Sequence, residues 1–200
     1  MRLIIMTFIT LATAAVTGFG SAWLALGERP VTGATRLGPW RAWPATGRPD
    51  VDPYGRAVAA RTAALPLGAG EGVELVAEHD SDGQPLRGGC VYEITGRTPE
   101  ARIWTLAATP LRPDGTAAPA GPAAPLAQPR ALTSEGLLRD PDGGVRIAVA
   151  ATPQPGDWIA APPSGRFRLT LRLYDSPTGF ISRPDMSEQL TPAIRRKRCA

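Results

Sequence analysis

The single histidine of the chain, His79, lies beside Asp80 and close to Asp82. An imidazole next to carboxylates could act as a general base or supply one metal ligand. A catalytic triad also needs a positioned nucleophile, and no serine lies in a Gly-x-Ser-x-Gly turn. Aspartates that hydrogen-bond to the backbone of their own turn explain the same residues without catalysis. We therefore interpret 79–83 as a turn and keep a hydrolase-like site, with His79, Asp80 and an arginine clamp, as the alternative.

Metal ligation has weaker support, because metal sites usually recruit three or more ligands. Glu78, Asp80 and Asp82 resemble the start of a calcium loop, but Gly89 stands where the closing acidic ligand belongs. Cys90 and Cys199 have no partner at zinc-finger or redox-motif spacing. We expect no metal and no cofactor. A buried thiol is the favoured interpretation of Cys90, Cys199 is expected in a mobile tail, and a disulfide between them stays an open alternative.

Arginines alternate with apolar residues near the end of the sequence. Arg168 and Arg172, with Arg166 and Tyr174 nearby, would share the polar face of a strand. Guanidinium groups beside an aromatic ring could bind a carboxylate, a phosphate or a sugar, and Arg172 is the strongest candidate. A solvated strand face is the simpler interpretation, and we favour it. Trp158 is expected to be exposed in a Pro/Gly-rich loop, where its ring could stack on a sugar.

Short strands and many turns must position these side chains. Proline and glycine number 22 each and gather between apolar runs, which is typical of β domains. Asp52 and Pro53 predict the start of one short helix that ends before Leu65. Strands are expected at 73–78, 90–95, 102–107, 145–150 and 167–174, with a turn at 140–144 and a loop at 110–130. The sequence predicts a mainly β fold, an antiparallel β-sandwich or jelly-roll-like domain with one short N-terminal helix, preceded by a single transmembrane helix.

The first segment is uncharged from Leu3 to Leu26. As a helix it would span about 36 Å, enough for a hydrocarbon core of about 30 Å. A cleaved signal peptide is the alternative, with a small-residue site before Trp23. We favour an uncleaved anchor because the apolar run continues past that site. Arg2 favours a cytoplasmic N-terminus, whereas Arg29 and the next arginines favour the reverse. Long domains translocate largely regardless of such charges, so we predict a single-pass membrane protein with its domain outside the cytoplasm.

The formal net charge of +4 comes from the C-terminus. Residues 195–198 are all basic, and without them 22 − 4 = 18 basic residues balance 18 acidic ones. Nucleic-acid binders carry a basic stripe with stacking aromatics, which is not visible here, so we exclude nucleic acid as a partner. We expect 186–200 to form a basic tail that either contacts anionic headgroups or is simply solvated.

Two segments carry a family resemblance. Gly156-Asp-Trp-Ile-Ala-Ala-Pro precedes the strand Phe-Arg-Leu-Thr-Leu-Arg-Leu-Tyr at 167–174, and Asp80, Tyr92 and Trp104-Thr-Leu occur upstream in order. The arrangement resembles the bacterial domain-of-unknown-function 1214 family over about 50–177. The resemblance implies a β-rich fold and a bacterial envelope setting, and it supplies no reaction. With the predicted anchor, it leads us to expect a single-pass protein of the bacterial inner membrane with its domain in the periplasm. It also suggests a short anchored member without the companion N-terminal domain that many members carry.

These observations predict an anchor at 1–27, a connector at 28–49, a β-rich domain at 50–185 and a tail at 186–200. The leading hypothesis is a membrane-anchored envelope protein that acts as a non-catalytic binding or structural module. A small anionic or sugar ligand would contact Arg172, Tyr174, Trp158, Arg168, His79 and Asp80. Besides the hydrolase, the alternative is a subunit of a membrane complex, with an exposed apolar patch around Trp40 and Trp43.

Overall fold

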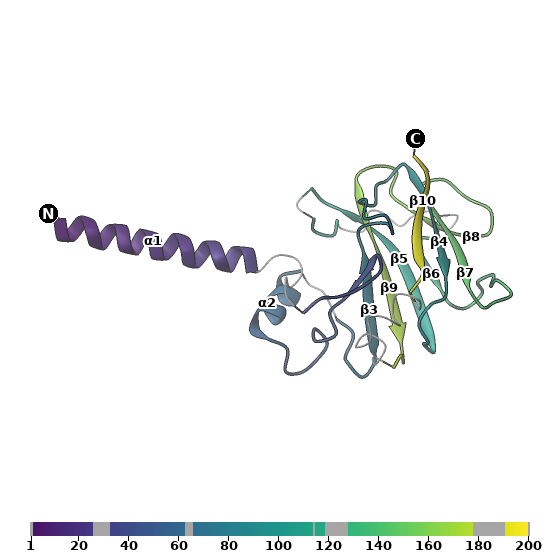
Figure 1. The fold of residues 1–200 in the computed structure, drawn as a ribbon, viewed down its shortest axis with the longest axis horizontal. Coiled ribbons are helices and arrows are strands. Elements are labelled where there is room, and N and C mark those ends of the chain that lie inside the picture. Colours follow the sequence, from purple (N-terminus) through teal and green to yellow (C-terminus); the bar gives the residue numbers. More distant parts are fainter. Residues whose placement is uncertain are drawn as a thin grey trace.

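The computed structural model describes residues 2–25, 33–62, 66–113, 115–118, 128–177 and 191–199. They form a mainly β fold with two packed sheets, as predicted, and two helices (Figure 1). The six-stranded sheet has the order β1-β2-β3-β9-β5-β6, and the four-stranded sheet has the order β10-β4-β7-β8. The strands are β1 (Thr35–Leu37), β2 (Trp40–Ala42), β3 (Gly72–Ala77), β4 (Cys90–Gly96), β5 (Ile103–Leu111), β6 (Ala131–Thr133), β7 (Val145–Ala150), β8 (Asp157–Ala160), β9 (Arg166–Tyr174) and β10 (Ala193–Cys199).

The core lies between the two sheets and follows the predicted alternation of β9. Phe167, Leu169, Leu171 and Leu173 are at most 1% exposed, and they belong to one cluster with inward residues of the four-stranded sheet. Tyr92 of β4 meets Phe167 edge to face, with ring centroids 5.8 Å apart. Alternate burial on each strand therefore closes a β-sandwich, because residues two apart share one face of a strand.

The strands on either side of the predicted turn at 79–83, β3 and β4, do not pair with each other. The sequence suggests that the strand at 90–95 returns beside the strand at 73–78. Instead, β3 pairs with β2 and β9, whereas β4 pairs with β10 and β7 in the other sheet. The chain crosses from one layer to the other because both strands have an inward apolar face that needs the opposite sheet.

Several segments expected to be irregular are strands. Within the predicted connector, β1 and β2 form an antiparallel pair, and Leu37 and Trp40 are fully buried. The indole N–H of Trp40 donates to the carbonyl of Pro192 at 2.7 Å. This burial removes Trp40 from the apolar surface patch proposed for a membrane complex, and Trp43 is half-buried. In addition, β5 extends through Pro110 to Leu111, beyond the end of its pairing with β6.

Helix α2 (Pro53–Thr62) confirms the predicted capping. Asp52 Oδ1 accepts hydrogen bonds from the backbone N–H groups of Tyr54 at 2.9 Å and Gly55 at 3.0 Å. These contacts satisfy two of the amide groups that a helix start leaves free. The turn at 140–144 also forms as predicted, since the Asp140 N–H donates to the Gly144 carbonyl at 3.0 Å.

Helix α1 (Arg2–Ala25) is long and apolar enough to cross a membrane, with no part of its apolar window buried inside the protein. Its threonines hydrogen-bond to carbonyl oxygens four residues earlier, for example Thr7 to Leu3 at 2.9 Å and Thr13 to Ile9 at 2.8 Å. Helix hydroxyls satisfied in this way leave fewer unpaired polar groups in an apolar surrounding.

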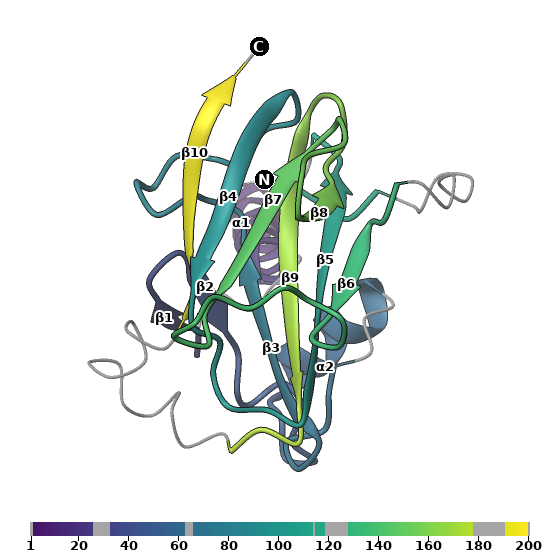
Figure 2. The same ribbon diagram turned by 90° about the vertical axis from the view of Figure 1, so that its right-hand side faces the viewer.

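The predicted basic tail is wrong over 193–199, because this segment is the edge strand β10 (Figure 2). It pairs antiparallel with β4, and the register places Cys199 directly opposite Cys90. The two cysteines form a disulfide, so neither the buried thiol nor the mobile cysteine is correct. Residues 186–190 of the predicted tail lie outside the described residues.

Candidate functional site

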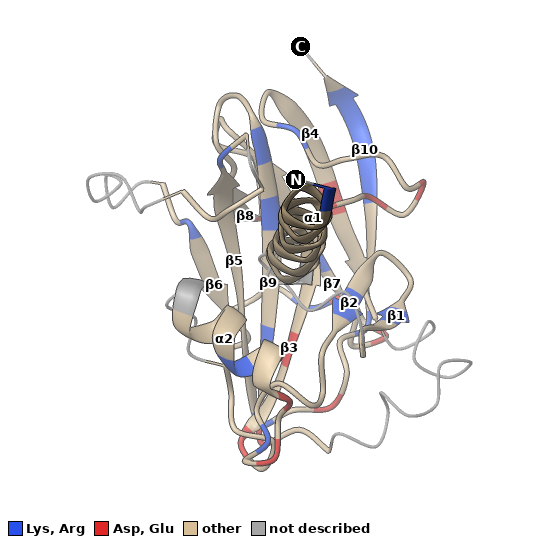
Figure 3. Ribbon diagram, turned by 90° about the vertical axis from the view of Figure 1, so that its left-hand side faces the viewer, with Lys and Arg blue, Asp and Glu red and all other residues tan. Residues whose placement is uncertain are grey.

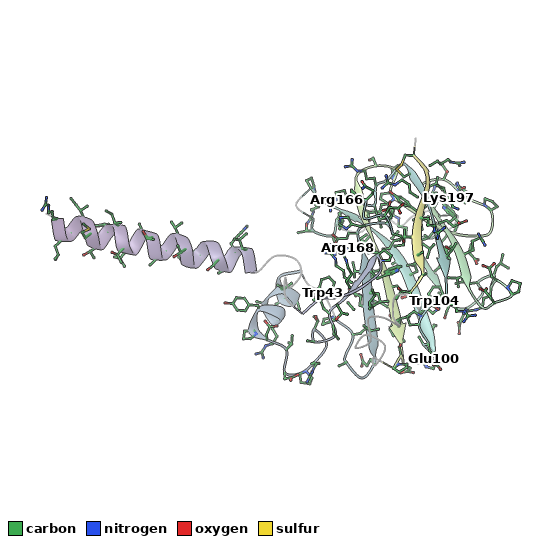
Figure 4. The ribbon with its side chains drawn as sticks, viewed as in Figure 1. Trp43, Glu100, Trp104, Arg166, Arg168 and Lys197 are labelled. Atoms are coloured by element: carbon green, nitrogen blue, oxygen red, sulfur yellow. A yellow bond between two sulfur atoms is a disulfide. The ribbon has the colours of Figure 1, made fainter. Side chains whose placement is uncertain are left out.

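The outward face of the six-stranded sheet collects the arginines singled out in the sequence. Arg166, Arg168 and Arg172 alternate with the buried residues of β9 and so point away from the core. Figure 4 labels Arg166 and Arg168 on one side of the domain and Lys197 of β10 toward the other. The sequence alternation correctly predicts which residues of β9 share this face.

Two of these arginines have acidic partners on β3 or directly after it. Arg172 Nε lies 3.0 Å from Glu74 Oε2, and these residues are directly opposite each other in the β3–β9 register. Arg168 Nη2 lies 3.1 Å from Glu78 Oε1 and donates to the Gly115 carbonyl at 3.0 Å. Arg168 is only 8% exposed, so the solvated strand face that we favoured is wrong at this position. Both guanidinium groups are engaged within the domain.

Arg166 has a different environment. It forms an isolated antiparallel bridge with Arg87, and both side chains are exposed. Residues directly opposite in an antiparallel pair project to the same face, with Cβ atoms about 5 Å apart. Among the residues that the structure describes, neither arginine has an acidic partner. Two like charges are therefore held side by side.

The backbone around this pair is fixed by several contacts. The Arg87 N–H donates to the Tyr92 hydroxyl at 2.9 Å, and the Gly88 N–H donates to the Gly165 carbonyl at 2.8 Å. A Cβ on Gly88 would lie 2.5 Å from the Pro162 carbonyl oxygen, so the two loops pack closely. The arrangement is pre-formed, because Tyr92 is itself fully buried in the core.

A second like-charge pair lies near the start of the sandwich. Arg36 of β1 is directly opposite Arg41 of β2, and both side chains are exposed. Arg41 is also opposite Val76 of β3, which places the pair on the same outward face as Arg166. We call Arg36, Arg41, Arg87 and Arg166 the arginine face. Figure 3 looks onto this side and shows basic residues on β1, β2 and β9, and also on β10 at the edge of the other sheet.

The structure places the predicted turn at His79 and Asp80 next to β10. Asp80 is 2% exposed, and its Oδ1 accepts the N–H groups of Asp82 at 3.2 Å and Gln84 at 2.8 Å. Its Oδ2 accepts from Arg196 Nη2 at 2.9 Å. The arginine also lies 5.7 Å from the centre of the Tyr92 ring. Asp80 thus caps its turn, as the simpler interpretation expects, and also fastens the C-terminal strand.

His79 and Arg172 do not lie together. Arg172 is opposite Glu74 near the start of β3, whereas His79 lies two residues beyond Ala77, the end of that strand, which is opposite Leu169. The hydrolase alternative requires both side chains in one cleft, and this register does not bring them together. Among the described residues, no cluster of three or more potential metal ligands occurs.

The two aromatic candidates also have separate positions. Tyr174 is half-buried at the end of β9, opposite Ile103. Trp158 belongs to β8, on the other sheet, and is 8% exposed rather than exposed in a loop. Its indole N–H donates to the Ala150 carbonyl at 3.0 Å. The prediction of an exposed Trp158 is therefore wrong, because its ring packs on the small residues Ala150 and Ala160.

The outer surface of the four-stranded sheet has its own ionic contacts. Glu93 of β4 lies 2.7 Å from Lys197 Nζ and 3.5 Å from Arg146 Nη1. The hydrogen bond from Lys197 holds the pKa of the Glu93 carboxyl below its usual value; partial burial opposes this effect, and the charges of Lys197 and Arg146 add to it. These basic residues are thus neutralised locally, unlike the arginine face.

Arg87, Arg36 and Arg41 do not stand out in the sequence as site residues, and Arg36 and Arg41 are there only charges that follow the apolar segment. The alternation of Arg41 with the buried Trp40 and Ala42 is a local signal for an outward arginine. No local signal places Arg87 opposite Arg166, because these residues are 79 positions apart and meet only through the fold.

The fold and its surface define a mainly β, two-sheet domain with an N-terminal apolar helix and an outward basic face. The chain belongs to the family described as Protein of unknown function (DUF1214), which matches residues 71–178. The match covers β3 to β9 and confirms the resemblance found in the sequence. It leaves out β1, β2 and β10, and with them Arg36, Arg41 and one cysteine of the disulfide.

Two solved structures are similar to the chain. The VPA0106 protein of Vibrio parahaemolyticus has a TM-score of 0.54 and 16% identity, covering 74% of this chain and 36% of its own length. An uncharacterised protein from Burkholderia cenocepacia has a TM-score of 0.43 and 23% identity, covering 66% of this chain and 31% of its own. The chain thus spans about a third of either protein, and the first likeness supports the fold alone. No curated protein matches the sequence.

Proposed function

We propose that the protein is a single-pass membrane-anchored module of the bacterial envelope, whose sandwich lies outside the cytoplasm and binds a partner without catalysis. Helix α1 supports the anchor, since its 24 residues reach about 36 Å against a hydrocarbon core of about 30 Å. The satisfied threonine hydroxyls along it suit a lipid environment.

The disulfide between Cys90 and Cys199 is the observation that best supports a sandwich outside the cytoplasm. Structural disulfides persist in oxidising compartments and are rare in the cytosol, where thiols are kept reduced. This pair joins two directly opposed strand positions, Cys199 is exposed, and the bond links residues 109 positions apart. A sandwich facing the cytoplasm would lose this link. The disulfide therefore favours an extracytoplasmic sandwich. This evidence matters because the charges on the two sides of the helix favour opposite membrane orientations.

We propose a binding role rather than a hydrolytic one because the predicted polar site residues make their contacts within the domain. Both carboxylate oxygens of Asp80 accept hydrogen bonds within the fold. The guanidinium groups of Arg168 and Arg172 have acidic partners, and His79 is well separated from Arg172. The arginine face remains as a charged surface that can contact a partner.

Membrane topology is the experiment that tests this proposal. The full chain would be expressed in bacteria, the membranes would be washed with alkaline carbonate, and spheroplasts would be treated with protease. We expect a carbonate-resistant chain with residues 2–25 retained by mass spectrometry, a protease-sensitive domain and an oxidised Cys90–Cys199 pair. A shortened chain that carbonate extracts from the membrane would mean that residues 2–25 are a cleaved signal peptide and not an anchor. A protected domain with two free thiols would overturn the extracytoplasmic assignment.

A further inference from the structure

The arginine face is one of two places in the sandwich where positive charge gathers, and β10, with four consecutive basic residues at 195–198, is the other. Outside residues 195–198, the chain has equal numbers of basic and acidic residues. The outward strand positions of this sheet nevertheless carry five arginines, namely Arg36, Arg41, Arg166, Arg168 and Arg172, against one acidic residue, Glu74. The balance at these positions is 5 − 1 = +4.

The two like-charge pairs indicate that this charge has a use outside the fold. Like charges directly opposite on neighbouring strands destabilise a sheet. Charged residues on an edge strand prevent unwanted pairing, which would account for Arg36 on β1. That reason does not extend to Arg166, because β9 is paired with Leu111 of β5 on one side of this position and bridged to Arg87 on the other. An external anion would relieve the repulsion in both pairs.

Chain connectivity identifies which anionic surface is near. Arg36 follows Ala25, the end of α1, by 11 residues, which span at most about 40 Å even when fully extended. An anchored α1 therefore keeps the arginine face within reach of the phosphate groups of its own bilayer. A short tether gives these groups a high effective concentration at the sheet, without any requirement for tight binding.

We propose that the arginine face docks on the anionic phospholipid surface of the membrane that α1 spans, through Arg36, Arg41, Arg87 and Arg166. This inference rests on the proposed membrane anchor and names the partner of the module. Guanidinium groups suit phosphate oxygens, because they present paired N–H donors in a fixed plane. Docking would hold the six-stranded sheet toward the lipid and leave the four-stranded sheet, with its neutralised Glu93–Lys197 contacts, facing away.

Arginine footprinting of the full chain in lipid nanodiscs tests the inference. The chain would be inserted into discs of phosphatidylcholine alone or with phosphatidylglycerol, modified with a glyoxal reagent and mapped by mass spectrometry. We expect the modification rates of Arg36, Arg41, Arg87 and Arg166 to fall at least about fivefold in the anionic discs, because a single arginine near an anionic surface already contributes about 1 kcal/mol. Raising the salt toward about 1 M should restore them, because screening then acts within about 3 Å. Arg195 and Arg198, exposed on β10, serve as internal controls.

Matched double variants sharpen the test. Arg36→Gln with Arg41→Gln should weaken docking about 25-fold, two factors of five, and expose Arg87 and Arg166 again. Arg195→Gln with Arg198→Gln removes the same charge from β10 and should leave the protection intact. All four side chains are exposed, so the variants are expected to fold, which circular dichroism would check.

Three outcomes would overturn the inference. Equal modification of the arginine face in neutral and anionic discs would show that it does not dock on anionic lipid. Protection of Arg195 to the same extent would show that the attraction to the membrane is not specific to the arginine face. Protection by soluble pyrophosphate in neutral discs, with none from anionic lipid, would indicate a soluble phosphate ligand instead. Co-elution of the chain with the disc reports insertion of α1 separately. A failed anchor is thereby distinguished from a failed docking face.

Discussion

Removal of the Cys90–Cys199 disulfide tests the role of the C-terminal strand in the sandwich. The bond closes a loop across a sequence separation of 109 residues and links the edge strand β10 to β4. In the chain-entropy description, a loop of this length contributes about 4.8 kcal/mol at 25 °C, and measured values are typically 2–4 kcal/mol, so about 4.8 is an upper limit. We therefore expect the Cys90→Ser, Cys199→Ser variant to unfold at a clearly lower temperature.

The size of the temperature shift follows from the size of the domain. For domains of 150–250 residues, about 1 kcal/mol changes the Tm by about 2–4 °C. A loss approaching the upper limit then lowers the Tm by about 10–20 °C. The Asp80–Arg196 contact and the hydrogen bond from the Ile194 N–H to Ser81 Oγ, 2.9 Å, remain in the variant. These contacts should keep β10 in place at low temperature, so the native signal is retained.

Thermal unfolding of the full chain in detergent, followed by near-ultraviolet circular dichroism, measures the effect. The wild type would be compared with and without a reductant, and thiol titration would confirm that both cysteines are free. The Tm of the reduced wild type should match that of the double serine variant. Reductant should not change the Tm of the variant. The reasoning is refuted if fully reduced wild type unfolds within about 3 °C of the oxidised protein, which corresponds to about 1 kcal/mol.

Three further predictions concern the strand contacts. Replacement of Asp80 by alanine leaves Arg196 without its carboxylate and two turn N–H groups without an acceptor, so the free energy of unfolding in urea should fall by about 2–4 kcal/mol, with a smaller loss for Asp80→Asn. Trp158→Ala should cost about 3–5 kcal/mol in the same assay, because it removes a buried ring, whereas an exposed tryptophan would cost little. The lowered pKa of Glu93 gives stability that is fully present above its ordinary value of 4.5 and is lost as the pH falls through the lower folded value. Acid titration of Glu93→Gln should therefore show a shallower loss of stability than the wild type below about pH 5.

Each of these predictions has a contradicting result. A neutral Asp80→Ala variant would mean that the turn and β10 are independent of this carboxylate. A loss of less than about 1 kcal/mol in the free energy of unfolding of Trp158→Ala is the scale of a surface change and would mean that the Trp158 ring is exposed to solvent. Parallel acid titrations of the wild type and Glu93→Gln would show that the Glu93–Lys197 contact does not contribute to the pH dependence of stability.

Elements whose signals are local can be predicted from the sequence without knowledge of the fold. Alternation at every second residue placed β9 and its inward leucines, and the Asp52-Pro53 pair placed the start of α2. The turn at 140–144 was equally readable, because its geometry depends on neighbouring residues. The helix of α1 followed from an uninterrupted apolar run. Such patterns need no knowledge of which strand lies beside which.

Features that depend on distant partners become visible only in the folded domain. Residues 193–199 form a strand because β4 offers an unpaired edge, and the basic sequence Arg-Arg-Lys-Arg alone indicates a solvated tail. Trp158 is buried because β8 pairs with β7, although its Pro/Gly-rich neighbours suggest a loop. The cysteine pair and the bridge between Arg87 and Arg166 join positions far apart in the chain. Only the register of the sheets brings these groups together, since side-chain spacing along a strand carries no information about the strand beside it.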